Sequence, residues 1–206
     1  ETIAGLEAKP SVFLSGSAIG IYGARGDETL DESSAVGSDF LAELCVKWEA
    51  ATAAAEAAGV RVAHLRTGIV LSTKGGALKK QLPLFKLGLG GKFGSGKQWQ
   101  SWISIEDEVG AIVHLLTADV EGAVDLTAPT PVTNAAFTAA LAKVLHRPAL
   151  LPIPAFGPKL LLGGELAEAL LFTGQKVLPT KLQRSGYQFL HPELGAALAS
   201  LLTSKQ

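Results

Sequence analysis

Near its start this sequence predicts a strand, a helix and a second strand that follow one another with short connections. Apolar residues 12–14 predict a buried strand. Apolar residues then recur at helical spacing after Ser38 and Asp39, either of which is a suitable N-cap. Gly59 is placed to end that helix, and residues 60–65 predict the second strand. This succession is the βαβ unit of a parallel sheet, with a right-handed crossover expected.

The remainder of the chain is less regular. Beyond Ser72 the regular alternation of strands and helices stops, and residues 74–96 are rich in glycine and lysine. Ser104 and Asp107 form a capping box that begins a helix, with Asp in place of the usual Glu or Gln. Further elements are predicted in this order: a strand over 99–105, a strand over 123–128, a helix after Thr133, an extended segment over 148–154, a helix within 156–172 and a last helix near Pro192.

Composition and charge argue against several kinds of partner. The formal net charge is -1 and 48% of the residues are hydrophobic, so no strong field points to nucleic acid or to an anionic membrane surface. The apolar run 160–162 is too short to span a bilayer. A single cysteine excludes an internal disulfide framework, and the dispersed histidines show no metal-ligand spacing. We therefore expect a cytoplasmic protein without a metal site.

A glycine-rich loop at residues 91–97 matches the first seven positions of the phosphate-binding P-loop pattern. The eighth position requires Ser or Thr but is Gln98, and the following residues predict a strand where the pattern needs a helix. We therefore interpret this segment as a flexible loop over a substrate pocket. The residues expected to contact the substrate are Gly94, Ser95, Gln98 and Trp99.

Small residues at 15–18 follow the first strand, at the edge where ligands bind to open α/β sheets. They are consistent with a ligand contact, or equally with a tight turn carrying a solvated serine. Arg66 follows the second strand at the same edge, where it would bind an anion or close the strand with a salt bridge. Cys45 lies on the apolar stripe of the helix, together with Phe40 and Trp48, and is expected to be structural.

Three segments together resemble the extended short-chain dehydrogenases/reductases. They are FLSGSAIGIYG at 13–23, LRTGIVL at 65–71 and SWISIED at 101–107, with Ser104 where His is usual. Other segments are similar to an epimerase-like subfamily, sometimes labelled cell-division-inhibitor-like, that has a characteristic C-terminal domain. Those segments are 39–45, 88–96, 126–134, 175–179 and 186–187.

The resemblance implies the C-terminal part of a Rossmann-like parallel sheet with a smaller α+β substrate lobe. Residues 1–73 and 101–128 would form the sheet domain, and residues 74–100 and 129–206 the lobe. The family's N-terminal glycine-rich strand-turn-helix, which holds the dinucleotide, has no counterpart here. We therefore expect this chain to be a fragment, or part of a longer polypeptide.

The resemblance also implies a function. It indicates an NAD(P)-dependent nucleotide-sugar epimerase or dehydratase-like oxidoreductase, with NADP as the preferred cofactor and NAD as the alternative. The substrate would be a small molecule such as a nucleotide sugar, and a homodimer is compatible with the family. Ser17 would be catalytic, and the cofactor would be bound by Ser15, Gly16, Ala18, Ile19, Thr67, Gly68 and Ile69.

One departure from the family bears directly on the chemistry. The family's catalytic helix carries Tyr-x-x-x-Lys, but Phe40 and Leu44 stand at those positions here, and neither can transfer a proton. The resemblance therefore supports cofactor binding better than epimerase chemistry. The alternative function is a cofactor-sensing or partner-binding protein that kept the fold and lost the reaction. A role in cell division rests on the family label alone.

Overall fold

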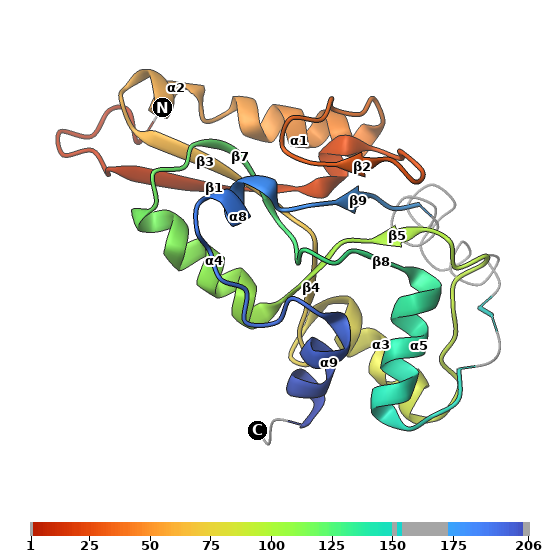
Figure 1. The fold of residues 1–206 in the computed structure, drawn as a ribbon. Helices are drawn as coiled ribbons and strands as arrows, with labels where there is room; N and C mark the ends of the chain where they lie inside the picture. The colour runs from red at the N-terminus through yellow and green to blue at the C-terminus, as the bar shows by residue number, and fades with distance from the viewer. Residues whose placement is uncertain (1, 150–151, 154–172, 204–206) are drawn as a thin grey trace.

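The computed structural model describes residues 2–149, 152–153 and 173–203, and its centre is a three-stranded parallel sheet (Figure 1). The strands are β1 (Val12–Ala18), β3 (Arg61–Thr67) and β7 (Gly122–Leu126), in the order β1-β3-β7. The register sets Ala18 opposite Thr67 and Thr67 opposite Leu126, so the carboxyl ends of all three strands are level. The predicted α/β fold and its βαβ unit are confirmed.

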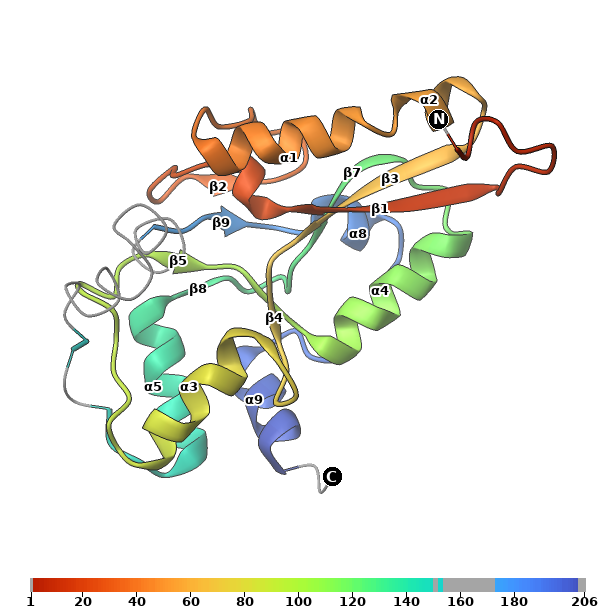
Figure 2. The same ribbon diagram turned by 180° about the vertical axis from the view of Figure 1, so that it is seen from behind.

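Helices cover both faces of this sheet (Figures 1 and 2). α1 (Phe40–Ala50) and α2 (Ala53–Ala57) run along one face, and α4 (Ile105–Thr117) lies against the other. Asp39 caps α1 by accepting a hydrogen bond from the Ala42 N–H. The single predicted helix is divided at Thr52, whose hydroxyl donates to the Glu49 carbonyl. Gly59 has a φ of 80°, as its predicted role at the helix end requires.

The predicted apolar stripe of α1 is wrong at two positions. Phe40 is 76% exposed and Trp48 is 50% exposed, while Ala42 and Cys45 face the core. The physical reason is that α1 lies close over β1 and the short 3₁₀ helix η1 (Ile19–Tyr22), where only small side chains fit. Residues 15–18 are also not a turn: they continue strand β1 to Ala18.

A second group of helices packs beyond the sheet. α3 (Gly76–Lys86), α5 (Asn134–Leu145) and α9 (Leu194–Thr203) share one apolar core that includes Trp102. The sequence predicted no regular element over residues 74–96, and the structure places helix α3 in the first half of that range. Leu78, Leu82 and Phe85 recur along one side of α3 and are buried, which stabilises a helix despite an internal proline.

Short strand pairs join the sheet to these helices. β4 (Ile69–Leu71) pairs with β6 (Trp102–Ser104), and β5 (Trp99–Gln100) pairs with β8 (Val132–Thr133). The strand predicted over 99–105 is thus interrupted at Ser101, whose hydroxyl donates to the Gln175 carbonyl and accepts from the Val177 N–H. β2 (Thr29–Leu30) pairs with β9 (Lys176–Val177), which precedes α8 (Thr180–Arg184).

Two predicted helix starts are confirmed by their caps. The Ser104 hydroxyl accepts from the Asp107 N–H, and the Thr133 hydroxyl accepts from the Ala136 N–H. The last helix begins at Leu194, two residues after Pro192. The predicted helix within 156–172 lies outside the described residues. Within the described ranges, no helix is long and apolar enough to cross a membrane.

Candidate functional site

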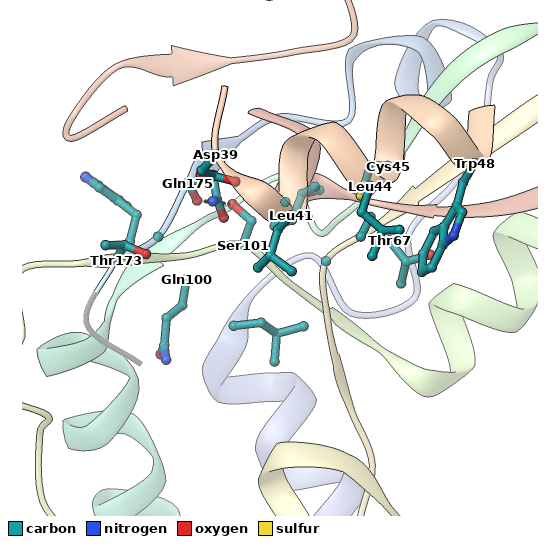
Figure 3. Close-up of a pocket in the computed structure, with 17 residues that line it drawn as sticks. Asp39, Leu41, Leu44, Cys45, Trp48, Thr67, Gln100, Ser101, Thr173 and Gln175 are labelled. Carbon is teal, nitrogen blue, oxygen red and sulfur yellow. Dashed lines mark hydrogen bonds between the residues drawn. The ribbon is translucent and has the colours of Figure 1, made fainter. Parts of the chain in front are cut away.

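A cavity of about 320 Å³ lies at the carboxyl ends of β1 and β3, beneath α1 (Figure 3). α1 supplies one wall with Leu41, Leu44 and Trp48, and Cys45 lies between them. The floor and the opposite side come from the strand ends and from the segment before β9. These residues are Ala18, Ile19, Gly20, Thr67, Gly68, Ile69, Trp99, Gln100, Ser101, Thr173, Gly174 and Gln175, with Asp39 at the start of α1.

Gly68 is the residue that allows the chain to pass from β3 into β4 at this point. A Cβ atom there would lie 2.5 Å from the Ser101 carbonyl oxygen and 2.8 Å from Thr127 Cγ2. The backbone N–H of Ile69 donates to the same Ser101 oxygen at 2.8 Å. Only glycine permits this approach, which brings the end of the parallel sheet against β6 and shapes the cavity floor.

The structure brings together part of the predicted set of site residues. Ala18, Ile19, Thr67, Gly68, Ile69 and Trp99 line the cavity, whereas Ser15, Gly16, Ser17, Gly94, Ser95 and Gln98 do not. Sequence reasoning missed the wall formed by α1 and the two glutamines, Gln100 and Gln175. A signal for the wall was present, because Leu44 stands at the family's lysine position on that helix.

Ser17 takes part in a buried network beside the cavity. Its hydroxyl donates to Glu49 Oε1 at 2.8 Å, and the Arg66 guanidinium binds both Glu49 oxygens at 2.8 and 2.9 Å. Of the two roles left open for Arg66, the structure shows the salt bridge. Ala18, which carries no hydroxyl, lies at the cavity wall in place of Ser17. Catalysis by Ser17 stays a prediction, and this geometry gives the hydroxyl a structural partner.

The network continues across the sheet to β7. Arg66 Nη1 donates to the Tyr22 hydroxyl at 3.0 Å, and that hydroxyl lies 2.9 Å from both oxygens of Asp125. The strand register explains the alignment, because Ser17, Arg66 and Asp125 are neighbours in one row across β1, β3 and β7. Residues in one row point to the same face of a sheet.

Burial and charge divide the two carboxyl groups of this network. Burial, together with the charge of Glu32, raises the pKa of Asp125 to about 8. Burial also acts to raise the pKa of Glu49, but hydrogen bonds from Arg66 and Ser17 outweigh it and lower that pKa. Glu49 is therefore the anionic partner of Arg66, and Asp125 holds a proton near neutral pH.

Outside the network, the carboxyl group of Glu108 lies next to the cavity and is bonded to Thr67 of the cavity lining. The Thr67 hydroxyl donates to Glu108 Oε1 at 3.0 Å from the last residue of β3. Burial raises the pKa of Glu108 to about 7. Glu108 is 8% exposed, and its Oε2 atom is buried without a hydrogen-bond partner in the described structure.

The glycine-rich loop before β5 is held by hydrogen bonds that its backbone N–H groups donate. The Phe93 N–H donates to Asn134 Oδ1 at 2.8 Å, and the Gly94 N–H donates to the Ile153 carbonyl at 3.1 Å. Strand β5 follows the loop where a P-loop requires a helix, as the sequence predicted. Among the described residues, no group of three or more His, Cys, Asp or Glu side chains could hold a metal ion.

A parallel sheet covered on both faces, with its cavity at the carboxyl ends of the strands, defines a Rossmann-like α/β protein. Comparison with known proteins identifies the group within that class. The chain belongs to the epimerase family that includes human SDR39U1. The crystal structure of the human protein (isoform 2), determined with NADPH, superposes with a TM-score of 0.90 at 34% identity, covering 98% of this chain and 69% of that one.

Two further relatives support the assignment. An epimerase family protein of Mycobacterium bovis is 43% identical over 198 residues, which are 96% of this chain and 65% of the relative. A nucleoside-diphosphate sugar epimerase from Corynebacterium glutamicum has a TM-score of 0.75 at 39% identity, covering 99% of this chain and 40% of that one. Residues 153–201 match a family model described as a domain of unknown function (DUF1731). The chain thus spans about two thirds of the mycobacterial relative's length.

Proposed function

We propose that the complete protein is an NADPH-binding, epimerase-like oxidoreductase whose nicotinamide ring lies in the cavity beneath α1. The observation that carries the proposal is the position of that cavity at the level carboxyl ends of β1 and β3. A human relative with the same fold was solved with NADPH, which favours NADP over NAD as the cofactor. The single buried cysteine accords with a reducing compartment such as the cytoplasm.

The residues that line the cavity fit the nicotinamide end of such a cofactor. Ala18 and Gly20 leave room for a flat ring at the strand ends, and Ile19 and Leu44 offer apolar surface. Bound NADPH would supply a hydride to the substrate. Among the described residues, no G-x-G-x-x-G turn stands between a strand and a helix, so we assign no described residue to the pyrophosphate.

The groups that would move a proton differ from those of the family pattern. Phe40 is 76% exposed and Leu44 is part of the apolar wall. Burial raises the pKa of Cys45, which keeps its thiol neutral. The Thr67 hydroxyl lines the cavity and is bonded to Glu108, whose pKa of about 7 lets it hold or release a proton near neutral pH. We assign to this pair the proton-transfer role in the proposed reaction.

A second candidate function follows from the same observation. A protein that binds NADPH without turning it over would need the cavity but no acid or base, and the replaced tyrosine and lysine favour this sensor. Turnover separates the two candidates. Sustained NADPH consumption with a carbonyl substrate supports the oxidoreductase, and saturable binding without consumption supports the sensor.

The first experiment is a calorimetric titration of the complete protein with NADPH. Saturable binding is expected, and Ala18→Leu should weaken it because the larger side chain enters the cavity at the strand end. Val46→Leu, on the 40% exposed Val46 of α1, is the matched control and should bind as the wild type does. If the wild-type protein shows no binding, the proposed cofactor role is wrong.

The nucleotide-sugar substrate implied by the family resemblance is the finer part of this proposal. UDP-glucose, titrated in the presence of saturating NADPH, tests it directly. Binding and epimerisation of UDP-glucose would support that substrate class, and no binding would contradict it.

A further inference from the structure

The charges of this chain are unevenly distributed between its parts. No acidic residue occurs in residues 57–105 or 126–164, so the net charge of -1 conceals a basic region. Helices α3 and α5 belong to these ranges, and they lie on the side of the molecule opposite α1 and α2 (Figures 1 and 2). The cations of α3, of α5 and of their flanking loops are Lys74, Lys79, Lys80, Lys86, Lys92, Lys97, Lys143 and Arg147.

Three leucines are exposed at the end of α3. Leu87 is 73% exposed, Leu89 64% and Leu84 47%. Gly88, with a φ of 74°, turns the chain there, and the Leu89 N–H donates to the Leu84 carbonyl at 2.9 Å. This is a Schellman cap, which returns the chain beside the last turn of the helix. The cap gathers Leu84, Leu87 and Leu89 into one exposed apolar surface, the leucine patch.

Basic side chains lie beside the leucine patch. Lys80 precedes Leu84 by one helical turn and Lys86 directly precedes Leu87, and both lysines are exposed. Arg147 reaches the same place from the end of α5, where its Nε atom donates to the Lys86 carbonyl at 2.9 Å. Among the described residues, no carboxylate forms an ion pair with any of these three cations.

Exposed leucines flanked by unpaired cations suit the surface of an anionic membrane. The apolar side chains can enter the boundary between headgroups and acyl chains, while lysine and arginine attract the lipid phosphates. A nucleic acid would use the cations but would leave the leucines in water, since its bases stack on aromatic side chains. The centre of a protein interface is depleted in lysine, which disfavours a protein partner.

We infer that the leucine patch binds the surface of a membrane that contains anionic phospholipid. The patch holds the chain at the headgroups and does not span the bilayer. None of its leucines lines the cavity beneath α1, so this inference is independent of the proposed function. NADPH binding should accordingly be the same in every variant of the patch.

Vesicle co-sedimentation of the complete protein tests the inference. Vesicles of phosphatidylcholine with phosphatidylglycerol are compared with vesicles of phosphatidylcholine alone. We expect saturable binding to the anionic vesicles only, weakened by salt. The double change Leu87→Ser and Leu89→Ser should weaken this binding by about tenfold or more, because it removes apolar contact with the lipid. Leu190→Ser, on a 68% exposed leucine outside the patch, is the matched control and should bind as the wild type does.

Lysine variants test the electrostatic part separately. Lys80→Gln and Lys86→Gln should each weaken binding to anionic vesicles about fivefold, the contribution of one basic residue near such a surface. Lys47→Gln, on an exposed residue of α1, is their control and should change nothing. These variants keep the test decisive if the leucine variant does not fold.

Several outcomes would overturn the inference. They are no binding to anionic vesicles, equal binding to neutral vesicles, and unchanged binding in the leucine and lysine variants. Binding of double-stranded DNA that needs the lysines but not the leucines, without vesicle binding, would show a nucleic-acid partner instead. Self-association that is lost in the leucine variant, again without vesicle binding, would show that the patch joins two copies of the chain.

Discussion

The network over the sheet and the cavity beside it use polar side chains in opposite ways. In the network, Glu49 of α1, Arg66 of β3, Tyr22 of η1 and Asp125 of β7 are bonded to one another, and all are largely buried. In the cavity, Gln100 has an oxygen without a partner, and apolar residues form the facing wall. The charged groups of the network bond to one another across the sheet, whereas the described lining of the cavity is nearly free of charge.

The largest expected effect comes from breaking the ion pair of the network. Glu49→Ala leaves the Arg66 guanidinium buried without its counter-ion, and such changes cost about 3–5 kcal/mol of unfolding free energy. Chemical denaturation measures the loss. Glu43→Ala, on the exposed side of α1, should change stability by less than about 0.5 kcal/mol. A small loss of unfolding free energy in Glu49→Ala would show that the ion pair contributes little to stability. The network and the cavity would then not differ in the way described above.

The next effect comes from the centre of the network. Tyr22→Phe removes the hydroxyl that joins Arg66 to Asp125 and leaves the Asp125 carboxyl short of a donor. The expected loss of unfolding free energy is about 1–3 kcal/mol. Thermal unfolding of the variant beside Tyr187→Phe, whose hydroxyl is bonded to Asp107 outside the network, compares the two sites. Equal unfolding temperature in Tyr22→Phe and wild type would contradict the prediction.

Glu108 lies outside the network and bonds Thr67 of the cavity lining, and its effect depends on pH. Its pKa of about 7 lies above the usual value of 4.5, so the folded protein holds a proton that the unfolded chain releases between those values. The stability it contributes is present below pH 4.5 and is lost as the pH rises through 7. Glu108→Gln should remove this part of the pH dependence, which leaves the variant more stable than wild type at pH 8.

Denaturation curves at pH 5 and pH 8 measure that difference. Glu43→Gln, on an exposed residue of α1, is the control and should keep the wild-type slope. An unchanged slope in Glu108→Gln would show that the carboxyl is ionised throughout. The burial of its Oε2 atom without a donor would then need another explanation.

The smallest effect is expected in the cavity. Gln100→Leu removes an unpaired buried oxygen and adds apolar contact, so the unfolding free energy should stay within about 0.5 kcal/mol or rise slightly. Calorimetric unfolding of the ligand-free variant checks this. A loss above 1 kcal/mol, roughly the value of one hydrogen bond, would mean that Gln100 has a structural partner and that the two regions are not as different as described.

Local sequence patterns predicted most of the helices and strands, and contacts between residues far apart in the sequence determine how they pack. The caps at Ser104 and Thr133 depend on residues three positions apart, so the sequence was sufficient for them. Helix α3 was not predicted because two glycines and a proline disfavour a helix, although Leu78, Leu82 and Phe85 have helical spacing. That spacing was available in the sequence, whereas its burial against α5 and α9 was not.

The candidate site was predicted in part for a related reason. Ala18 and Thr67 are the last residues of β1 and β3, Gly68 comes directly after β3, and strand ends can be located in a sequence. The direction of Ser17 depends on the register of β1 and β3, which places it in one row with Arg66 and facing α1. Whether Gln100 Oε1 is buried without a hydrogen-bond partner depends on every neighbour of that side chain, and no sequence pattern contains this information.

The alternation of Arg66 and Thr67 along β3 has a consequence for how this family can change over time. Arg66 faces α1 and bonds Glu49, while the adjacent Thr67 bonds Glu108 of α4 on the other face. Two consecutive residues thus lie in different environments, one in the buried network and one in the cavity lining. Under the proposed function, substitutions in the cavity lining outside the Thr67–Glu108 pair would alter ligand preference while the sheet keeps its stability.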